Sequence, residues 1–223
     1  MAYRAVYHLN GDGIDASGNG YNGTVVGGTF NVSGKFNQCY SGVSGAGTNY
    51  MTAPTGAGLP YYSGTMSIWV SIASQFTASY RAMCGYALST GTSGVNSDLY
   101  YGTASGTVVI RFEPSYLAGL GNGGCDYAVT LTTGTWYHVV GTTDSSWSYL
   151  YLNGKLVKQA TNTVGTYANV VNRLVVGNNH AVSAYNWWGN LDEAIFDNVT
   201  WSASQVRNYY NQAVGRYAPK ARF

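Results

Sequence analysis

The sequence predicts an all-β fold, a sandwich of two antiparallel sheets that carries one short C-terminal helix. Short runs of β-branched and aromatic residues, separated by Gly and Asn, recur from end to end, and this pattern is typical of such sandwiches. A chain of 223 residues, 45% of them hydrophobic, can bury a core as one domain. We therefore expect one domain over residues 1–215 and a basic, aromatic tail over residues 216–223.

The clearest strand signals are alternating apolar and polar residues. Residues 65–72 and 107–113 alternate over their whole length, which indicates strands with one buried face. Residues 147–152 end in Asn153-Gly154, which predicts a tight hairpin with a return strand at residues 155–159. The other expected strands are residues 3–9, 24–26, 50–52, 136–142, 174–177 and 191–198, with a short one at Cys39.

One helix is signalled near the C-terminus. Ser202 and Gln205 have the spacing of a capping box, and Trp201 and Val206 stand where a hydrophobic staple would,. We expect this helix to lie over an edge or an end of the sandwich.

The charge of the chain is too low for a nucleic-acid partner. Charged residues make up 9% of the sequence and the net charge is +2, whereas about 25% is usual and phosphate binding needs clustered Lys and Arg. There is no run of about 18 apolar residues and no signal peptide in this chain, so we expect no membrane insertion. Because so few residues are charged, the polar surface must consist of Ser, Thr, Asn, Gly and Tyr.

The three cysteines indicate neither a disulfide framework nor a zinc site, because their number is odd and their spacing is wide,. We expect Cys39 and Cys84 to be buried thiols. Cys125 follows a Gly-rich loop, and we expect it to be exposed.

Two acidic segments bracket the chain. Residues 15–24 are a run of turn formers that begins with Asp15, and residues 189–195 contain Asp192 and Glu193 at the head of a strand. Carboxylates and loop carbonyls brought together in this way suit a hard cation such as calcium. The alternative is a surface turn and an edge strand that merely contain acids.

Seven motifs follow one another along nearly the whole chain. They are Tyr7-His8-Leu9-Asn10, the Asp-x-Ser-Gly-Asn-Gly turn at residues 15–20, Met66-Ser67-Ile68-Trp69-Val70, Trp136-Tyr137-His138-Val139-Val140, Leu150-Tyr151-Leu152-Asn153-Gly154, Trp188-Gly189-Asn190-Leu191-Asp192-Glu193-Ala194 and the helix from Trp201. Taken in this order, they resemble the laminin G-like jellyroll domains of the concanavalin A-like lectin/glucanase superfamily. Each motif alone is weak, and the assignment rests on their shared order. The resemblance implies a concanavalin A-like jellyroll β-sandwich.

The resemblance also implies one Ca²⁺ near the opening turn. The positions that match the family's ligands are Asp15 and either Asp192 or Glu193, and Asn10 and Asn22 are further oxygen donors. Asn10 stands where the family often has an acid, so the predicted site is weak.

Glycoside hydrolysis, as in the glucanase branch of this superfamily, is the less favoured hypothesis, and we expect no enzyme activity. Glycoside hydrolysis needs two carboxyl groups about 5 to 10 Å apart. Glu193 and Asp197 share a strand face at a spacing of four residues, roughly 13 Å. Glu113 has no evident carboxylate partner in the sequence.

Aromatic residues in loops are the expected contacts for a glycan. Aromatic faces with neighbouring amides suit sugar rings, and they equally suit burial between subunits. We expect Trp188 to be a core residue. The expected carbohydrate-binding residues are Trp187, Tyr185, Tyr62, Tyr61, His180 and Asn186.

Two functions remain open at this point. One is a virion surface protein, such as a capsid-decorating or fibre-associated subunit of a bacteriophage, which self-associates or binds other virion proteins and contacts host glycan. The low charge, the missing secretion signal and the start at the first strand favour it. The alternative is a secreted, extracellular carbohydrate-binding module. We expect a non-catalytic adhesion protein that binds a glycan or a cell-surface polysaccharide.

Overall fold

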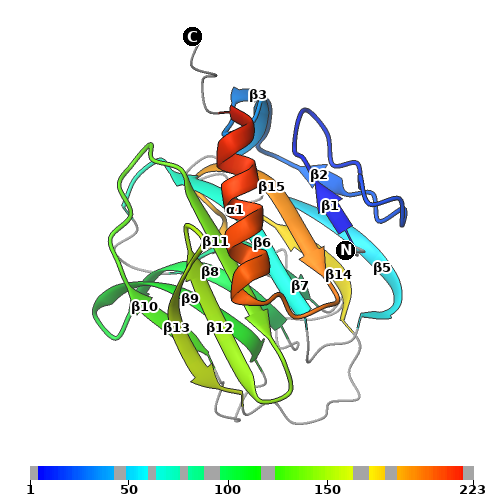
Figure 1. Cartoon of the computed structure of the whole chain (residues 1–223). Coiled ribbons are helices and arrows are strands. Elements are labelled where there is room, and N and C mark those ends of the chain that lie inside the picture. Colours follow the sequence, from blue (N-terminus) through cyan, green and yellow to red (C-terminus); the bar gives the residue numbers. More distant parts are fainter. Residues whose placement is uncertain are drawn as a thin grey trace, which may run out of the picture.

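A computed structural model of the chain shows two antiparallel sheets packed face to face, with one helix across the outer face of the first sheet (Figure 1). It describes residues 5–42, 49–59, 64–75, 80–87, 96–116, 124–162, 171–178 and 185–217. The predicted concanavalin A-like jellyroll sandwich with one short C-terminal helix is confirmed.

In the first sheet, a strand from near the N-terminus pairs with a strand from near the C-terminus. Its order is β13-β12-β11-β6-β15-β4-β3, and β1 also pairs with β15, so that Val6 lies opposite Ile195. The expected hairpin at Asn153-Gly154 links β12 to β13, with positive φ at both residues. The strands are β1 (Ala5–Tyr7), β3 (Thr29–Ser33), β4 (Gln38–Gly42), β6 (Gly64–Ile72), β11 (Tyr137–Thr143), β12 (Trp147–Leu152), β13 (Lys155–Thr161) and β15 (Gly189–Asp197).

The second sheet has the order β10-β9-β8-β7-β14-β5-β2. Alternate residues of the two sheets meet in one core, which includes Ile68, Phe112 and Leu174. Cys125 is part of this core with 0% exposure, so the expectation that it is exposed was wrong. The strands are β2 (Thr24–Val26), β5 (Tyr50–Leu59), β7 (Arg81–Ala87), β8 (Asn96–Ala104), β9 (Thr107–Tyr116), β10 (Cys125–Ala128) and β14 (Val171–Val176).

The helix α1 (Ala203–Tyr217) begins at the predicted capping box. The Ser202 N–H donates to Gln205 Oε1 (2.8 Å), and the Gln205 N–H donates to Ser202 Oγ (3.3 Å). Trp201 and Val206 pack together in a second hydrophobic cluster that also takes residues from β11, β12 and β15. The helix therefore crosses the face of the first sheet, in front of β6 and β11 (Figure 1), and does not cover an edge or an end as expected.

The helix runs to Tyr217, two residues into the segment expected to be a tail. Residues 218–223 lie outside the described part of the chain. No helix among the described residues is long and apolar enough to cross a membrane.

Candidate functional site

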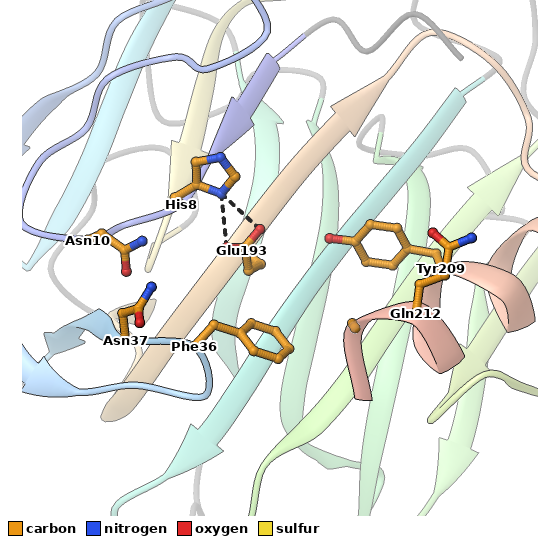
Figure 2. Close-up of a pocket in the computed structure, with 8 residues that line it drawn as sticks. His8, Asn10, Phe36, Asn37, Glu193, Tyr209 and Gln212 are labelled. Carbon is orange, nitrogen blue, oxygen red and sulfur yellow. Dashed lines mark hydrogen bonds and ion pairs between the residues drawn. The ribbon is translucent and has the colours of Figure 1, made fainter. Parts of the chain in front are cut away.

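A pocket of about 280 Å³ opens on the outer face of the first sheet, beside α1. Four segments build it: the chain after β1, the turn between β3 and β4, the strand β15, and α1 (Figure 2). It is therefore not a space between the two sheets. Its walls are formed by His8, Asn10, Phe36, Asn37, Glu193, Tyr209, Gln212 and Ala213.

Strained backbone surrounds this pocket. Five non-glycine residues of the described chain have positive φ, and three of them, Asn37, Ser105 and Asn153, stand in hairpin turns where this is ordinary,. The other two are Leu9 (57°), which follows His8, and the pocket residue Glu193 (50°). Such conformations cost about 1–3 kcal/mol each and cluster at ligand sites.

Glu193 is presented to the pocket by a β-bulge. The pairing of β15 with β6 shifts between Asp192 and Ile195. The extra residue of a bulge re-aims a side chain that regular alternation would place elsewhere. The Glu193 carboxylate consequently lies near the centre of the lining residues in Figure 2.

His8 holds the Glu193 carboxylate in place. Its Nδ1 lies 2.9 Å from Glu193 Oε1 and 3.0 Å from Oε2. The His8 side chain is 50% exposed and that of Glu193 is 16% exposed. Exposed ion pairs contribute little to stability, so the importance of this pair lies in orienting the carboxylate.

Amide and aromatic groups complete the walls. Asn10 accepts a hydrogen bond from the Gln38 N–H through Oδ1 (3.2 Å), which orients its amide group. Asn37 and Gln212 are exposed amides on opposite sides of the pocket, and Tyr209 directs its hydroxyl toward Glu193 (Figure 2). Phe36 adds an aromatic wall. This arrangement can hold a small molecule that has both hydroxyl groups and an apolar face.

Asp15, the first predicted calcium ligand, holds the opening turn. Its Oδ1 accepts from the N–H groups of Val6 (3.0 Å) and Ser17 (2.9 Å). Its Oδ2 accepts from Ser17 Oγ (2.8 Å) and the Tyr21 N–H (3.1 Å). Burial raises the pKa of Asp15, but these hydrogen bonds outweigh burial and the pKa lies below its ordinary value. Asn22 supports the same turn by accepting from the Asp15 N–H (3.0 Å).

Asp192, the second predicted ligand, is fully buried beneath the turn between β3 and β4. Its Oδ2 accepts from the Phe36 N–H (2.9 Å), and within the described chain its Oδ1 has no hydrogen-bond partner. Burial, with smaller effects from neighbouring groups, raises its pKa to about 7.

Calcium binding stays a prediction. The five expected ligands divide between the turn (Asp15, Asn22), the pocket (Asn10, Glu193) and the buried Asp192. No group of three or more His, Cys, Asp or Glu residues that could hold a metal occurs in the ranges described. A weak calcium site predicts a small rise in melting temperature when calcium is added to chelator-treated protein. An unchanged melting temperature would count against it.

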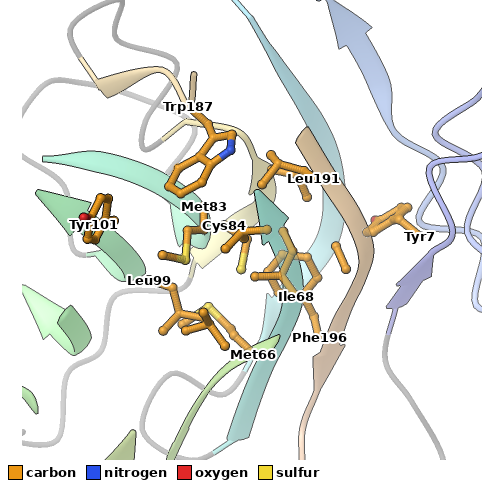
Figure 3. Close-up of a cluster of buried hydrophobic side chains, with 14 of the residues drawn as sticks. Tyr7, Met66, Ile68, Met83, Cys84, Leu99, Tyr101, Trp187, Leu191 and Phe196 are labelled. Carbon is orange, nitrogen blue, oxygen red and sulfur yellow. The ribbon is translucent and has the colours of Figure 1, made fainter. Parts of the chain in front are cut away.

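Of the two neighbouring tryptophans, Trp187 is the more deeply buried, and Trp188 packs against the core from its margin. Trp187 is 0% exposed and points into the core beside Leu191 (Figure 3), so the expectation that it contacts a glycan was wrong. Trp188 is half-buried, and the guanidinium of Arg81 lies 3.9 Å from the centre of its ring.

Of the other expected carbohydrate contacts, two lie in the described part of the chain and three do not. Asn186 is buried and accepts from Asn178 Nδ2 (2.7 Å), so it has a structural role in place of the expected surface role. Tyr185 is half-buried. Tyr61, Tyr62 and His180 lie outside the described residues.

A row of buried polar side chains crosses the first sheet beneath α1. His138 on β11 pairs in register with Trp69 on β6, which pairs with Asp192 on β15. His138 Nε2 bonds to Ser67 Oγ (2.8 Å), and burial lowers its pKa to about 3. The Trp69 ring stacks on His138 (5.1 Å) and on Tyr210 of α1 (5.6 Å). One atom of each member of the row, His138 Nδ1, Trp69 Nε1 and Asp192 Oδ1, lacks a hydrogen-bond partner within the described chain.

A second pair of carboxyl groups was missed in the sequence. Asp98 on β8 lies directly opposite Glu113 on β9, so the expectation that Glu113 lacks a carboxylate partner was wrong. Asp98 is 2% exposed and Glu113 is 7% exposed. Burial raises the pKa of Asp98 well above its ordinary value, and Glu113 adds to the rise, whereas the hydrogen bond from the Tyr100 hydroxyl (2.8 Å) opposes it.

Glu193 and Asp197, the two carboxyl groups considered for glycoside hydrolysis, do not lie in one site. Asp197 is 0% exposed and accepts from the Val199 N–H (3.0 Å) and Trp201 Nε1 (2.6 Å). It anchors the approach to α1 and does not line the pocket.

The family follows from comparison with known sequences. The Laminin_G_3 profile, described as Concanavalin A-like lectin/glucanases superfamily, matches residues 45–207. The chain therefore belongs to this superfamily. No curated protein sequence matches it.

Solved structures share the fold at low identity. Domain 4 of AbnA, a GH43 extracellular arabinanase from Geobacillus stearothermophilus in complex with arabinotriose, is 20% identical with a TM-score of 0.68, over 92% of this chain and 97% of that one. The botulinum neurotoxin type G receptor binding domain is 14% identical with a TM-score of 0.66, over 95% of this chain and 51% of that one. The CBM40 domain of the Ruminococcus gnavus IT-sialidase, bound to α2,3 sialyllactose, is 15% identical with a TM-score of 0.56, over 67% of this chain and 83% of that one.

Proposed function

We propose that this chain is a non-catalytic carbohydrate-binding domain of a surface or adhesion protein, and that the pocket beside α1 holds the sugar. One observation carries the proposal: every non-glycine residue of the described chain with positive φ that is not in a hairpin turn lies in this pocket or next to it. Backbone strain of this kind persists where it positions groups for a ligand.

The chemistry of the walls supports a sugar. Hydroxyl groups need both donors and acceptors, which the amides of Asn37 and Gln212 and the carboxylate of Glu193 provide,. The apolar face of a sugar ring needs an aromatic surface, which the half-buried Tyr209 provides,. The volume of about 280 Å³ is near the lower end of ligand pockets, about 300–1,000 Å³, and suits one or two sugar rings. Two of the similar structures hold oligosaccharides, arabinotriose and sialyllactose.

The proposal predicts saturable binding to an oligosaccharide. Saturation-transfer NMR with the intact chain and a panel that contains arabinotriose, galactose, N-acetylglucosamine and sialyllactose is expected to detect at least one binder. The variant Gln212→Ala is expected to weaken that binding several-fold, because one amide of the wall is lost. Asn208→Ala, an exposed residue of the same helix that does not line the pocket, is the matched control. Failure of every sugar to bind would contradict the proposal.

The burial of the acidic pairs supports binding without cleavage. Asp98 and Glu113 face each other across two neighbouring strands, and a pair of nearby carboxyl groups is what glycoside hydrolysis requires. This pair makes hydrolysis the second candidate function. At 2% and 7% exposure, however, neither is open to a substrate. We expect no release of reducing ends from any bound oligosaccharide. Release that Glu113→Gln abolishes would establish the enzyme instead.

A virion is the setting that we propose for this domain, as a capsid-decorating or fibre-associated subunit. The support is the low charge of the sequence, with 9% charged residues, which leaves a neutral polar surface suited to close packing with other subunits. Self-association or co-purification with phage particles is the expected result. A chain that stays monomeric at high concentration and is absent from purified particles would leave the secreted module as the better setting.

A further inference from the structure

Among the described residues that line the pocket beside α1, one side chain is acidic, and one, His8, becomes a cation when it is protonated. Glu193 is the acid, and neither Lys nor Arg is among the eight lining residues. Recognition of a sugar carboxylate normally relies on an Arg fork or a Lys ammonium group. An anionic sugar would therefore meet the like charge of Glu193, and the cation that could compensate it, protonated His8, is already paired with Glu193.

The Glu193 carboxylate is preorganised as an acceptor. The bulge in β15 and the φ of 50° fix its backbone, and His8 Nδ1 lies within 3.0 Å of both carboxylate oxygens. Each oxygen still has lone-pair capacity after this contact, because an ionised carboxylate accepts about four hydrogen bonds. Two hydroxyl groups on adjacent carbons can thus donate to the two oxygens of one carboxylate.

The remaining groups of the pocket wall can contact the rest of a sugar ring whose two adjacent hydroxyl groups bind Glu193. Asn10 uses Oδ1 to accept from the Gln38 N–H, so its Nδ2 hydrogens can donate to a ring or hydroxyl oxygen. Tyr209 is half-buried and offers aromatic surface to the C–H groups of the ring, from the side of the pocket opposite Phe36 (Figure 2),.

We infer that the pocket selects uncharged sugars that carry a free vicinal diol, with Glu193 accepting from both hydroxyl groups and Tyr209 against the ring. This inference rests on the proposed carbohydrate-binding function and adds the class of ligand. Sialic acids and uronic acids are excluded by the charge of Glu193.

The test compares neutral and acidic sugars on the intact chain and on Glu193→Gln. Saturation-transfer and titration NMR are run with arabinotriose, galactose and mannose, with sialyllactose and glucuronic acid, and with an analogue of the best binder that lacks one hydroxyl of the diol. Glu193→Gln keeps the shape of the side chain and removes the charge, and a charged hydrogen bond of this kind contributes about tenfold or more to affinity. Asp126→Asn is the matched control, because it removes one negative charge on β10 of the second sheet.

The expected result is binding of at least one neutral sugar, a loss of about tenfold or more in Glu193→Gln and in the deoxy analogue, and no loss in Asp126→Asn. Binding confined to the acidic sugars would overturn the inference and leave carbohydrate binding intact. Equal affinity of Glu193→Gln and the original chain for a neutral sugar would overturn the role of this carboxylate. Absence of binding by every sugar would overturn both the inference and the proposed function. Melting temperatures of the two variants confirm that each is folded.

Discussion

Replacing Asp15 by alanine is expected to lower the free energy of unfolding by about 3 to 5 kcal/mol. The carboxylate is 6% exposed and accepts hydrogen bonds from three backbone N–H groups and one hydroxyl. Each buried donor left without a partner costs about 1–3 kcal/mol. Because one of these donors belongs to Val6 of β1, the change also loosens the strand that closes the first sheet against β15. Urea unfolding at neutral pH measures the effect.

Asp12→Ala is the matched control for Asp15→Ala. Asp12 is an exposed acid of the same loop, and its side chain accepts one hydrogen bond, from the Ile14 N–H (3.1 Å). We expect a change of less than about 1 kcal/mol. Equal losses in the two variants would show that loop charge, and not the buried hydrogen bonds, stabilises the turn.

The stability that Asp15 contributes has a definite pH dependence. Its folded pKa lies below the ordinary value, so the contribution is complete above the ordinary pKa of about 3.9 and is lost as the pH falls through the folded pKa. The difference between wild type and Asp15→Ala should therefore narrow only in strong acid.

Substitutions of Asp192 and His138 are expected to change stability with pH in opposite directions. The pKa of Asp192 is raised to about 7, so the folded state binds its proton more tightly and its stability contribution is lost as the pH rises from about 4 to 7,. The pKa of His138 is lowered to about 3, so its contribution is lost as the pH falls below its ordinary value of about 6.5,. The free energy of unfolding of Asp192→Asn, relative to that of wild type, should rise by about 2 to 4 kcal/mol as the pH is raised from about 4.5 to 8. That of His138→Gln, relative to wild type, should rise by a similar amount as the pH is lowered from about 8 to 4.5.

Comparison with wild type at each pH isolates these two groups, because the other titrating residues are common to all three proteins. Urea unfolding of the wild type, the two single variants and the double variant completes the set. The double variant shows whether the two groups, which flank Trp69 in one row, act independently. Parallel pH profiles of Asp192→Asn and wild type would show that Asp192 titrates normally in the folded protein.

Local signals were sufficient to predict most of the fold. The capping box at Ser202 and Gln205, the hairpin at Asn153-Gly154 and the alternation in β6 each depend on residues close together in the chain. The position of α1 was not predicted, because the aromatic residues that receive it, Trp69 and His138, come from strands far away in the sequence.

The positions of two side chains, Trp187 and Asp98, follow from counting along the sequence. Counting back by two from the core residue Leu191 places Trp187 on the core face, as observed. Counting outward from a two-residue turn at Ser105-Gly106 places Asp98 opposite Glu113, which is the observed register.

The pocket was only partly predictable. His8 and Glu193 are separated by 185 positions, and a bulge breaks the alternation that would reveal the direction of Glu193. The resemblance to jellyroll domains did predict that the two ends of the chain lie together, because it implied that Asn10 and Glu193 belong to one site. The contributions of Tyr209 and Gln212 depend on where the helix crosses the sheet, which no local pattern encodes.

The pocket beside α1 is the proposed sugar-binding site. Chemical-shift mapping of the isotope-labelled chain during titration with its best oligosaccharide tests it directly. We predict that the largest shifts fall on His8, Asn37, Glu193 and Gln212, which line the pocket. Shifts concentrated instead around Tyr185, Trp188 and Arg81, or on the outer face of the second sheet, would contradict the claim.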